Sequence, residues 1–379
     1  MAVRILHLHS TFAAGGKEVR AVRLMNSFDG AARHTVLSAV PGALGARALI
    51  APEVTADFPE APALHGLPAP RRYLSLARFM TGFDLVLSYN WGAMDGVMAH
   101  RLLARAMRLP PLIHHEDGFN ADEMHRRKRK RTLFRKAAIG TARALVVPSE
   151  TLAVIAREEW GQDDRAIRFI ANGVAVDRYA AAPVAGVIPG FQRVPGEVVI
   201  GTIAGLRPVK NLPRLVRAFA ALGMAARLVI VGEGPEREAI AAEATALGVA
   251  DRLVMPGFVA DASRYVGHFD IFALSSDSEQ APVSLIEAMA AGLPIVTTDV
   301  GDICAMVSLE NRRFVVPADD EAAFAAALAR LVASRDLRYR VGTANREVAR
   351  ARYDERAMIA AYAALYEGAM GRPGALAID

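Results

Sequence analysis

Residues 275–294 read Ser-Ser-Asp-Ser-Glu-Gln-Ala-Pro-Val-Ser-Leu-Ile-Glu-Ala-Met-Ala-Ala-Gly-Leu-Pro. Pro282 suits the first position of a helix, Gly292 suits the residue that ends one, and Pro294 lies just beyond. The stretch therefore predicts a helix of about ten residues with a well-defined start and stop.

The start of this predicted helix is suited to phosphate. The N–H groups of Val283, Ser284 and Leu285 lack partners inside the helix and lie at the positive end of its dipole, so a diphosphate can dock there. Glu279 precedes the helix and Glu287 lies more than one turn inside it. The alternative interpretation makes Glu279 a partner of the helix dipole and Glu287 an ordinary surface acid.

A second feature lies upstream, at residues 201–211, which read Gly-Thr-Ile-Ala-Gly-Leu-Arg-Pro-Val-Lys-Asn. A predicted strand runs into a turn at Gly205 that carries Arg207 and Lys210. Arg207 can grip phosphate oxygens with two N–H groups and Lys210 can add a point charge, so the loop can stabilise a leaving diphosphate without a metal. Taken alone, two such cations are more often solvated surface charge.

With these residues the sequence resembles glycosyltransferase family 4, whose members are retaining nucleotide-sugar enzymes with the GT-B fold. The likeness spans nearly the whole chain and is more specific in the second half. It is carried by the Glu-x7-Glu of Glu279 and Glu287, the Arg207 and Lys210 pair, Val231–Pro235, Gly257–Val259, Glu287–Val296, Gly15–Glu18, His114–Gly118, Pro148–Thr151 and Asn172–Val174.

The resemblance implies roles for these residues. Glu279 would hold sugar hydroxyls and Glu287 the ribose of the donor, while Gly232 and Val259 would lie near the nucleotide. In the first half, Gly15 and Gly16 follow a predicted strand and precede a helix, so their amides can approach a diphosphate. We expect the reacting groups to be Arg207, Lys210, Glu279 and His114.

His114 and His115 end a predicted strand, and Glu116 and Asp117 follow. Strand alternation lets one histidine side chain point to each side, and the resemblance favours His114 as the one near the reacting sugar. A histidine at a strand end is often structural, and the doublet departs from the family's common pattern. Glu116 or Asp117 is a candidate base for the acceptor.

The composition is that of a globular protein with two domains. A chain of 379 residues exceeds the usual size of one core, and 53% hydrophobic residues can fill two. The single cysteine, Cys304, excludes an internal disulfide framework and favours the cytosol. The N-terminus resembles a first strand more than a signal peptide, and the apolar runs are shorter than a membrane span.

Positive charge is concentrated in residues 126–136, which hold eight cations and no acid. Such a run can bind an anionic membrane surface, bind nucleic acid or simply be solvated. Phe134 is the single aromatic residue in it, so base stacking is poorly supported and no nucleic-acid partner is expected. The resemblance favours contact with a membrane or polyanion through Arg126, Arg127, Lys128, Arg129, Lys130 and Arg131.

Short apolar runs alternate with helical stretches along the chain, which predicts an α/β protein with parallel sheets. In the first half the expected strands are Arg4–Leu8, Thr35–Val40, Asp84–Ser88, Leu112–His115, Leu145–Pro148 and Arg168–Ala171. In the second half they are Val198–Ile203, Arg227–Val231, Leu253–Pro256, Ile271–Leu274, Pro294–Thr297 and Arg313–Val316.

These strands predict two Rossmann-like domains, which the resemblance sets facing each other across a cleft. We expect an N-terminal acceptor domain (1–182), an Ala-, Pro- and Gly-rich linker (183–196), a C-terminal donor domain (197–352) and a last helix that packs back on the first domain (353–379).

The resemblance therefore implies a retaining glycosyltransferase, and we expect a UDP-sugar as its donor, with GDP-mannose as the next choice. The expected acceptor is lipid-linked or a polysaccharide, the expected location is the inner face of the cell membrane, and no cofactor or metal is expected. Two alternatives remain: a nucleotide-sugar epimerase or phosphorylase of similar fold, and a non-catalytic scaffold that binds polyanions. The sugar, the acceptor, the linkage and the oligomeric state stay open.

Overall fold

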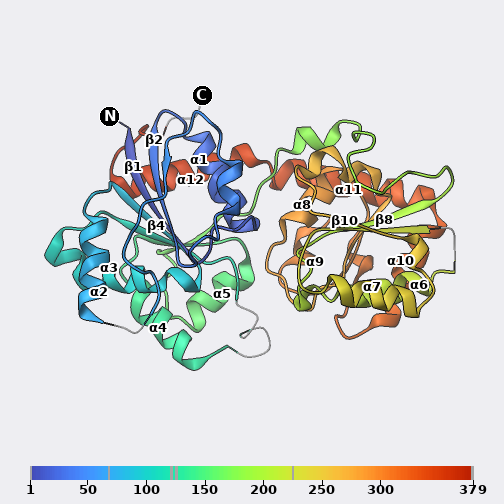
Figure 1. The fold of residues 1–379 in the computed structure, drawn as a ribbon, viewed down its shortest axis with the longest axis horizontal. Coiled ribbons are helices and arrows are strands. Elements are labelled where there is room, and N and C mark those ends of the chain that lie inside the picture. The colour runs from blue at the N-terminus through green and yellow to red at the C-terminus, as the bar shows by residue number, and fades with distance from the viewer. Residues whose placement is uncertain (1, 67–68, 120–122, 124–126, 224–225, 377–379) are drawn as a thin grey trace. The chain divides into compact units, whose positions relative to one another are not determined.

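The computed structural model describes residues 2–66, 69–119, 123, 127–223 and 226–376. The chain forms two compact units, one made of residues 1–171 and 357–379 and the other of residues 172–356 (Figure 1). Each unit is built around its own parallel sheet.

In the described residues, the first unit has a seven-stranded sheet in the order β3-β2-β1-β4-β5-β6-β7. The order reverses beside β1, where Ile5 pairs with His34 on one side and with Leu85 on the other. This is the topological switch point of a Rossmann sheet, where ligands collect. The strands are β1 (Val3–His9), β2 (Ala32–Ser38), β3 (Ala56–Asp57), β4 (Leu85–Tyr89), β5 (Leu112–His115), β6 (Ala144–Val147) and β7 (Ile167–Phe169).

Helices cover both faces of this sheet. On one face, α1 (Gly16–Ser27) shares a core with Val3 and Ile5 of β1. On the other face, Leu6 and Leu8 of the same strand pack with α2 (Pro70–Met80), α3 (Met94–Met107), α4 (Arg129–Ile139) and α5 (Glu150–Glu158). Strand alternation thus supplies both cores from one apolar strand.

The last helix, α12 (Glu355–Met370), belongs mainly to the first unit. Met358, Ile359, Tyr362 and Tyr366 are buried in the core that also holds α1 and β1. The expected return of the last helix to the first domain is confirmed.

The second unit has a six-stranded parallel sheet in the order β10-β9-β8-β11-β12-β13, as far as its residues are described. Its switch point lies between β8 and β11. The strands are β8 (Val198–Ile203), β9 (Ala226–Val231), β10 (Leu253–Gly257), β11 (Ile271–Leu274), β12 (Ile295–Thr298) and β13 (Val315–Val316).

The helices of the second unit are α6 (Leu212–Ala220), α7 (Arg237–Ala246), α8 (Val283–Ala290), α9 (Ile303–Met306), α10 (Glu321–Ala333) and α11 (Arg335–Arg352). Leu215, Phe219, Ile240 and Phe324 from α6, α7 and α10 form a core with the sheet. Helix α8 packs against α11 and against the short 3-10 helix η4 (Val176–Ala180).

Each strand expected from the sequence is present, with ends shifted by a few residues, and the predicted fold class is confirmed. The strand that the sequence analysis missed is β3, which has two residues and pairs only with β2. So short a strand carries too few residues for a recognisable alternation.

The chain leaves the first unit at residues 171–172, before the expected domain end at 182 and linker at 183–196. Three contacts tie this segment to the second unit. Val174 forms a β-bridge with Asp354, the Tyr179 hydroxyl donates to Glu287 at 2.9 Å, and the Val184 amide donates to the Arg264 carbonyl at 2.7 Å. The Ala-, Pro- and Gly-rich stretch is therefore part of that unit.

Candidate functional site

The loop after β8 is held against the loop after β9 by two glycines. Gly232 and Gly234 have φ angles of 140° and 157°. A Cβ on Gly232 would lie 1.9 Å from the Ala204 carbonyl oxygen, and one on Gly234 would lie 2.4 Å from that of Leu206. Only glycine allows the two backbones to approach so closely. This packing fixes the turn that leads to Arg207 and Lys210.

The two cations of this loop differ in their surroundings. The Lys210 ammonium contacts Oε1 of Glu279, and the Ser276 hydroxyl donates to the same oxygen at 2.7 Å. Arg207 is exposed, and its guanidinium makes no hydrogen bond or ion pair with the described part of the chain. Lys210 and Glu279, which the sequence analysis placed in one site, therefore lie together.

Further contacts tie the β8 loop to the segment after β11. The Asp277 amide donates to the Val209 carbonyl at 2.8 Å, and the Ser275 hydroxyl donates to the Lys210 carbonyl at 3.0 Å. Arg214 of α6 pairs with Asp277 at 2.9 Å. The two loops that flank the switch point of the second sheet thus form one surface, where ligands of such sheets bind.

Helix α8 starts from this surface. Its N-cap is Pro282, with ψ 126°, so the helix begins one residue later than the sequence indicated. Val283 and Ser284 are half-buried in the first turn, and Leu285 is buried. As predicted, the helix stops at Gly292, which has a φ of 76°.

Glu287, the second acid of the motif, lies inside α8. Its Oε1 accepts a hydrogen bond from the Tyr179 hydroxyl at 2.9 Å. Burial and the nearby Glu287 carboxylate raise the pKa of Tyr265. Tyr179 thus binds this carboxylate, and the sequence offered no signal for it.

The other predicted donor-site residues lie at the same edge of the second sheet. Gly205 is exposed and Val259 is half-buried. Phe258, between Gly257 and Val259, has a side chain that is 64% exposed. It follows Gly257, whose φ of 87° turns the chain away from β10.

In the first unit, Gly15 is the N-cap of α1 and Gly16 is its first residue. A Cβ on Gly15 would lie 2.9 Å from a carboxylate oxygen of Glu18. Glu18 is buried, and Lys17 contacts it. Burial raises the pKa of Glu18, and Lys17 opposes this shift.

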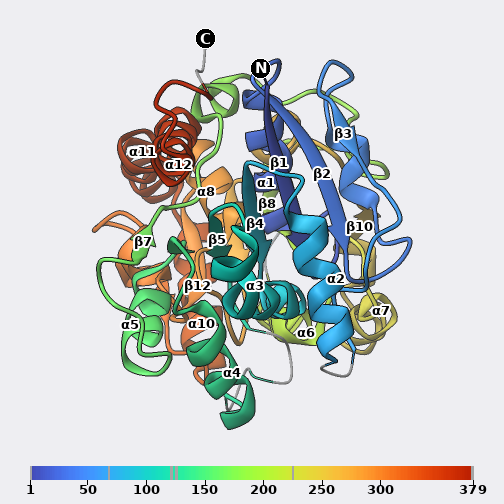
Figure 2. The same ribbon diagram turned by 90° about the vertical axis from the view of Figure 1, so that its left-hand side faces the viewer.

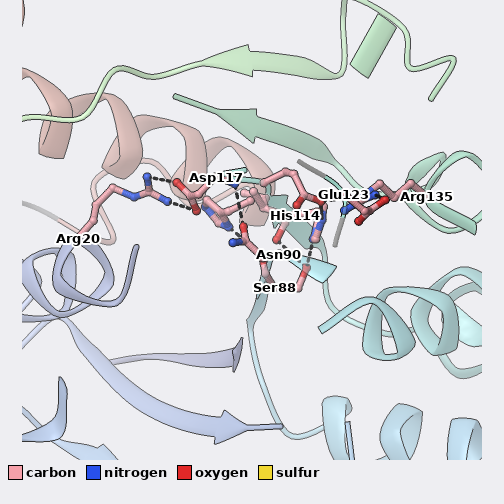
Figure 3. Close-up of polar contacts among 10 residues, drawn as sticks. Arg20, Ser88, Asn90, His114, Asp117, Glu123 and Arg135 are labelled. Carbon is pink, nitrogen blue, oxygen red and sulfur yellow. Dashed lines mark hydrogen bonds and ion pairs between the residues drawn. The ribbon is translucent and has the colours of Figure 1, made fainter. Parts of the chain in front are cut away.

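His114 lies at the end of β5 and is fully buried (Figure 3). Its Nδ1 is 2.9 Å from the Ser88 hydroxyl and its Nε2 is 3.4 Å from Oε2 of Glu116. A hydroxyl, an imidazole and a carboxylate also make up a nucleophilic triad. Ser88 is completely buried, so a substrate cannot reach its hydroxyl.

The chain of contacts continues into α4. Arg135 is fully buried and its Nε donates to Glu116 at 3.2 Å, while its Nη1 donates to Glu123 at 3.4 Å. Its guanidinium lies 5.0 Å from the ring centroid of Trp91 and 5.1 Å from that of Trp160. His114, Glu116 and Arg135 therefore form one buried polar network (Figure 3).

His115 points to the other side of β5, as strand alternation predicts. Its Nδ1–H donates to the Ser88 carbonyl at 3.1 Å, and its Nε2 accepts from the Tyr366 hydroxyl of α12 at 3.0 Å. Burial lowers the pKa of His115 to about 3. It is a neutral histidine in the core of the first unit.

Asp117 follows this strand and forms a two-fold ion pair with Arg20 of α1, at 2.5 and 2.9 Å (Figure 3). Its amide donates to the Asn90 side chain at 2.8 Å, and Asn90 has an unusual φ of 56°. Burial alone would raise the pKa of Asp117, but Arg20 outweighs it and lowers the pKa. Arg20 carried no sequence signal, because isolated arginines in helices are common.

The basic run divides between the interior and the surface. Arg127 pairs with Glu159, and Arg131 pairs with Glu123 at 2.9 Å. Lys128, Arg129 and Lys130 are exposed. Arg126, which the sequence analysis included, lies outside the described residues. Throughout the described residues, the helices are too short or too polar to cross a membrane.

Comparisons with known proteins agree with this architecture. The family model described as Glycosyltransferase Family 4 matches residues 2–178, and the one described as Glycosyl transferases group 1 matches residues 189–348. In structure the chain is similar to Anabaena Alr3699/HepE in complex with UDP, with a TM-score of 0.79, 18% identity and coverage of 96% of this chain and 100% of that one.

Among curated relatives, 2-deoxystreptamine glucosyltransferase of Streptomyces kanamyceticus is 30% identical over 46% of this chain and 47% of its own length. A GDP-mannose-dependent alpha-(1-6)-phosphatidylinositol monomannoside mannosyltransferase of Mycobacterium tuberculosis is 27% identical over 74% of this chain and 75% of its own. The chain spans less than half the length of the curated relatives that match first. The two family models cover most of the chain between them, and it belongs to glycosyltransferase family 4, with the GT-B fold.

Proposed function

We propose that this protein is a retaining, metal-independent glycosyltransferase that moves a sugar from a nucleoside diphosphate sugar to a lipid-linked or polysaccharide acceptor in cell-envelope glycan synthesis. The observation that carries the proposal is the joining of the β8 loop to the segment before α8. It puts Lys210 against Glu279 at the switch point of the second sheet.

In this proposal the second unit holds the donor. Arg207 and Lys210 neutralise the diphosphate together with the first-turn amides of α8, where negative charge develops as the sugar leaves. Without a donor, Lys210 is paired with Glu279. Donor binding would break this ion pair. Lys210 would then bind a phosphate oxygen, and Glu279 would accept hydrogen bonds from the sugar hydroxyls. Glu287 would bind the ribose.

The first unit supplies the candidate acceptor residues. His114 and Glu116 are fully buried in a network with Arg135, and Asp117 is held by Arg20. Because Arg20 lowers the pKa of Asp117, this carboxylate is a weak base and better suited to accepting hydrogen bonds from hydroxyls. Contact of Gly15 and Gly16 with the donor stays a prediction.

A UDP-sugar is the favoured donor, because the similar Anabaena structure is a complex with UDP. The name of the mycobacterial relative specifies GDP-mannose and a phosphatidylinositol acceptor, which supports a lipid-linked acceptor and keeps a GDP-sugar as the second choice.

The donor proposal is tested with a panel of UDP- and GDP-sugars in thermal-shift assays, followed by an assay for released nucleoside diphosphate. A true donor raises the melting temperature. Glu279→Ala should reduce sugar transfer at least about tenfold, whereas Glu238→Ala, an exposed acid on α7, should leave it unchanged. Chelation of divalent metal should leave the rate unchanged. An epimerase would release no nucleotide, and a scaffold would bind no donor.

The structure also supports peripheral attachment to an anionic membrane. Helices α2, α3 and α4 lie side by side on one face of the first sheet (Figure 2). Their exposed cations form a surface that we call the basic face, made of Arg71, Arg78, Arg101, Arg105, Arg129, Lys130 and Lys136. Leu102 and Leu133 lie among them and are 61% and 66% exposed.

Acids are scarce on these three helices. Asp95 is their single acid, and it is paired with Arg72 at 2.8 Å. Cations around exposed leucines suit an anionic lipid surface better than single-stranded nucleic acid, whose bases stack on aromatic side chains. The basic face extends the contact expected from residues 126–131 to two further helices.

Vesicle sedimentation tests this attachment. The protein should bind phosphatidylcholine vesicles that contain phosphatidylglycerol, bind pure phosphatidylcholine weakly, and dissociate in high salt. Changing Arg101, Arg105, Arg129 and Lys130 to Glu should abolish binding. The controls change exposed arginines of α11, Arg335 and Arg340, to Glu, and are compared with the pair Arg101 and Arg105 changed to Glu. Equal loss in both variants, or tighter binding to an oligonucleotide than to vesicles, would contradict a lipid surface.

A further inference from the structure

The C-terminal end of α8 is held by α11, the long helix that follows α10. Arg346 of α11 donates through Nη2 to the Ala291 carbonyl at 2.7 Å. Asn345, the residue before it, donates through Nδ2 to the Leu293 carbonyl at 2.9 Å. Carbonyl groups at the end of a helix lack partners within it, so α11 caps α8 from outside.

The two backbones also touch directly. A Cβ on Gly342 of α11 would lie 1.9 Å from the Gly292 carbonyl oxygen. A Cβ on Gly292 would in turn lie 2.5 Å from the Arg346 guanidinium. The end of α8 therefore fits closely between Gly342 and Arg346, and a displacement of either helix would move the other.

Asn345 extends this contact to the next strand. It is fully buried, its Oδ1 accepts from the Ser308 amide at 3.1 Å, and its Nδ2 also donates to Oδ1 of Asn311 at 2.9 Å. Asn311 bonds both the amide and the carbonyl of Ile295, at 2.8 and 2.9 Å. The end of α8, the start of β12 and the middle of α11 thus form one hydrogen-bonded block.

This hydrogen-bonded block lies at the C-terminal end of α8, and the donor diphosphate is predicted to bind at the N-terminal end of the same helix. Helix α8 has eight residues, so its two ends are about 12 Å apart. Glu287 is one turn from the capped end, and its carbonyl accepts the Ala291 amide at 3.0 Å. The charge of Arg346 at the C-terminus is also aligned favourably with the helix dipole. Holding the C-terminal end therefore sets the position of Glu287 and of the first-turn amides.

We propose that Asn345 and Arg346 are positioning residues for the nucleotide-sugar site, acting through α8. The inference rests on the proposed function, because it assigns the donor diphosphate and ribose to α8. Neither residue touches the donor. Their effect is on donor affinity.

Isothermal titration with UDP, and with GDP in parallel, tests the proposal on the full chain. Arg346→Ala should weaken binding of the nucleotide about tenfold in the folded fraction, and Arg346→Lys should restore it to within about threefold, because lysine keeps the charge at the helix end. The matched control is Arg350→Ala, one turn further along α11, where the side chain is exposed and has no partner among the described residues.

The outcomes separate the two ideas. If the wild type binds neither nucleotide, the proposed function fails and this inference fails with it. If the wild type binds and folded Arg346→Ala binds equally well, the positioning role alone is overturned, since a purely structural role changes the yield and melting temperature and leaves the affinity of the folded protein unchanged. If Arg346→Ala does not fold, Arg346→Gln is measured in its place. A nucleotide affinity of Arg346→Gln equal to that of Arg346→Lys would overturn the role of the charge.

Discussion

The position of the Lys210 ammonium group is set by the loop that carries it. The ammonium group is the partner of Glu279, and both groups lie where the loop after β8 meets the segment before α8. An exposed ion pair is worth little, but this one is mostly buried, with side-chain exposures of 15% and 10%. A donor diphosphate carries more charge than one carboxylate and would compete for the same cation.

We expect Lys210→Ala to lower kcat by about a hundredfold or more, because the charge that develops on the leaving diphosphate loses a preorganised partner. Lys210→Arg should keep part of the rate. Steady-state kinetics with the nucleotide sugar that the thermal-shift panel selects measures both. A fall in rate as large for Arg350→Ala would show that the loss is not specific to the site.

At the scale of elements, α4 has two different sides. Arg131 and Arg135 face inward and pair with Glu123 and Glu116, whereas Arg129, Lys130 and Lys136 face outward. A basic run that the sequence shows as uniform therefore fastens α4 to the end of β5 on one side. On the other side its cations are exposed.

Arg135→Met should destabilise the first unit by about 3–5 kcal/mol, because it leaves the buried Glu116 carboxylate without its arginine and takes one of two arginine partners from Glu123. Adding Glu116→Gln should recover part of this loss. Denaturant unfolding measures the free energies. Arg129→Met, on the exposed side of the same helix, should change stability by less than about 0.5 kcal/mol, and an equal effect of the two changes would contradict the buried network.

The last helix of the chain returns to the first unit. Helix α12 buries Tyr362 and Tyr366 in the core that holds β1. Tyr366 also bonds His115, 251 residues earlier in the chain. Contacts this distant in sequence are slow to form, so the first unit is complete only when the last helix has docked.

Tyr362→Ala should cost about 3–5 kcal/mol of stability in the first unit, since it leaves a cavity in a closed core. Tyr339→Ala is the control, because Tyr339 on α11 is 75% exposed. Thermal and denaturant unfolding distinguish them. Similar effects of the two substitutions would mean that α12 is not part of the core.

The first unit should also lose stability in acid. His7, His9, His34 and His115 are buried, and burial lowers their pKa values, to about 4 for His34 and about 3 for His115. In the unfolded chain they titrate near pH 6.5. Stability is therefore full above pH 6.5 and falls as the pH decreases, by up to about 1.4 kcal/mol per pH unit for each histidine.

His9→Phe should reduce this pH dependence. Both ring nitrogens of His9 lack a hydrogen-bond partner in the described residues, and the ring stacks on Tyr89 at 4.0 Å, which phenylalanine can also do. The free energy of unfolding measured at pH 7 and pH 5 should differ less in the variant than in the wild type. The exposed His65, changed to Phe, should leave the difference unchanged.

Much of the fold was predictable from local sequence. The strands are short apolar runs and α8 is bounded by Pro282 and Gly292, because backbone preference and alternation act over a few residues. That Lys210 and Glu279 lie in one site was also predictable, since both loops follow strands that flank a switch point, but their ion pair was not predicted.

Only the tertiary structure decided which charges are buried. Arg135 and Lys136 are neighbours in the basic run, yet one is enclosed by aromatic rings and the other is exposed. His114 and His115 enter different networks, and Arg346 reaches a helix end more than fifty residues away. The elements and their order follow from local sequence, because they depend on near neighbours. Whether each polar side chain is buried, and which partner it binds, depends on packing between segments that are distant in the sequence. This packing exists only in the folded chain.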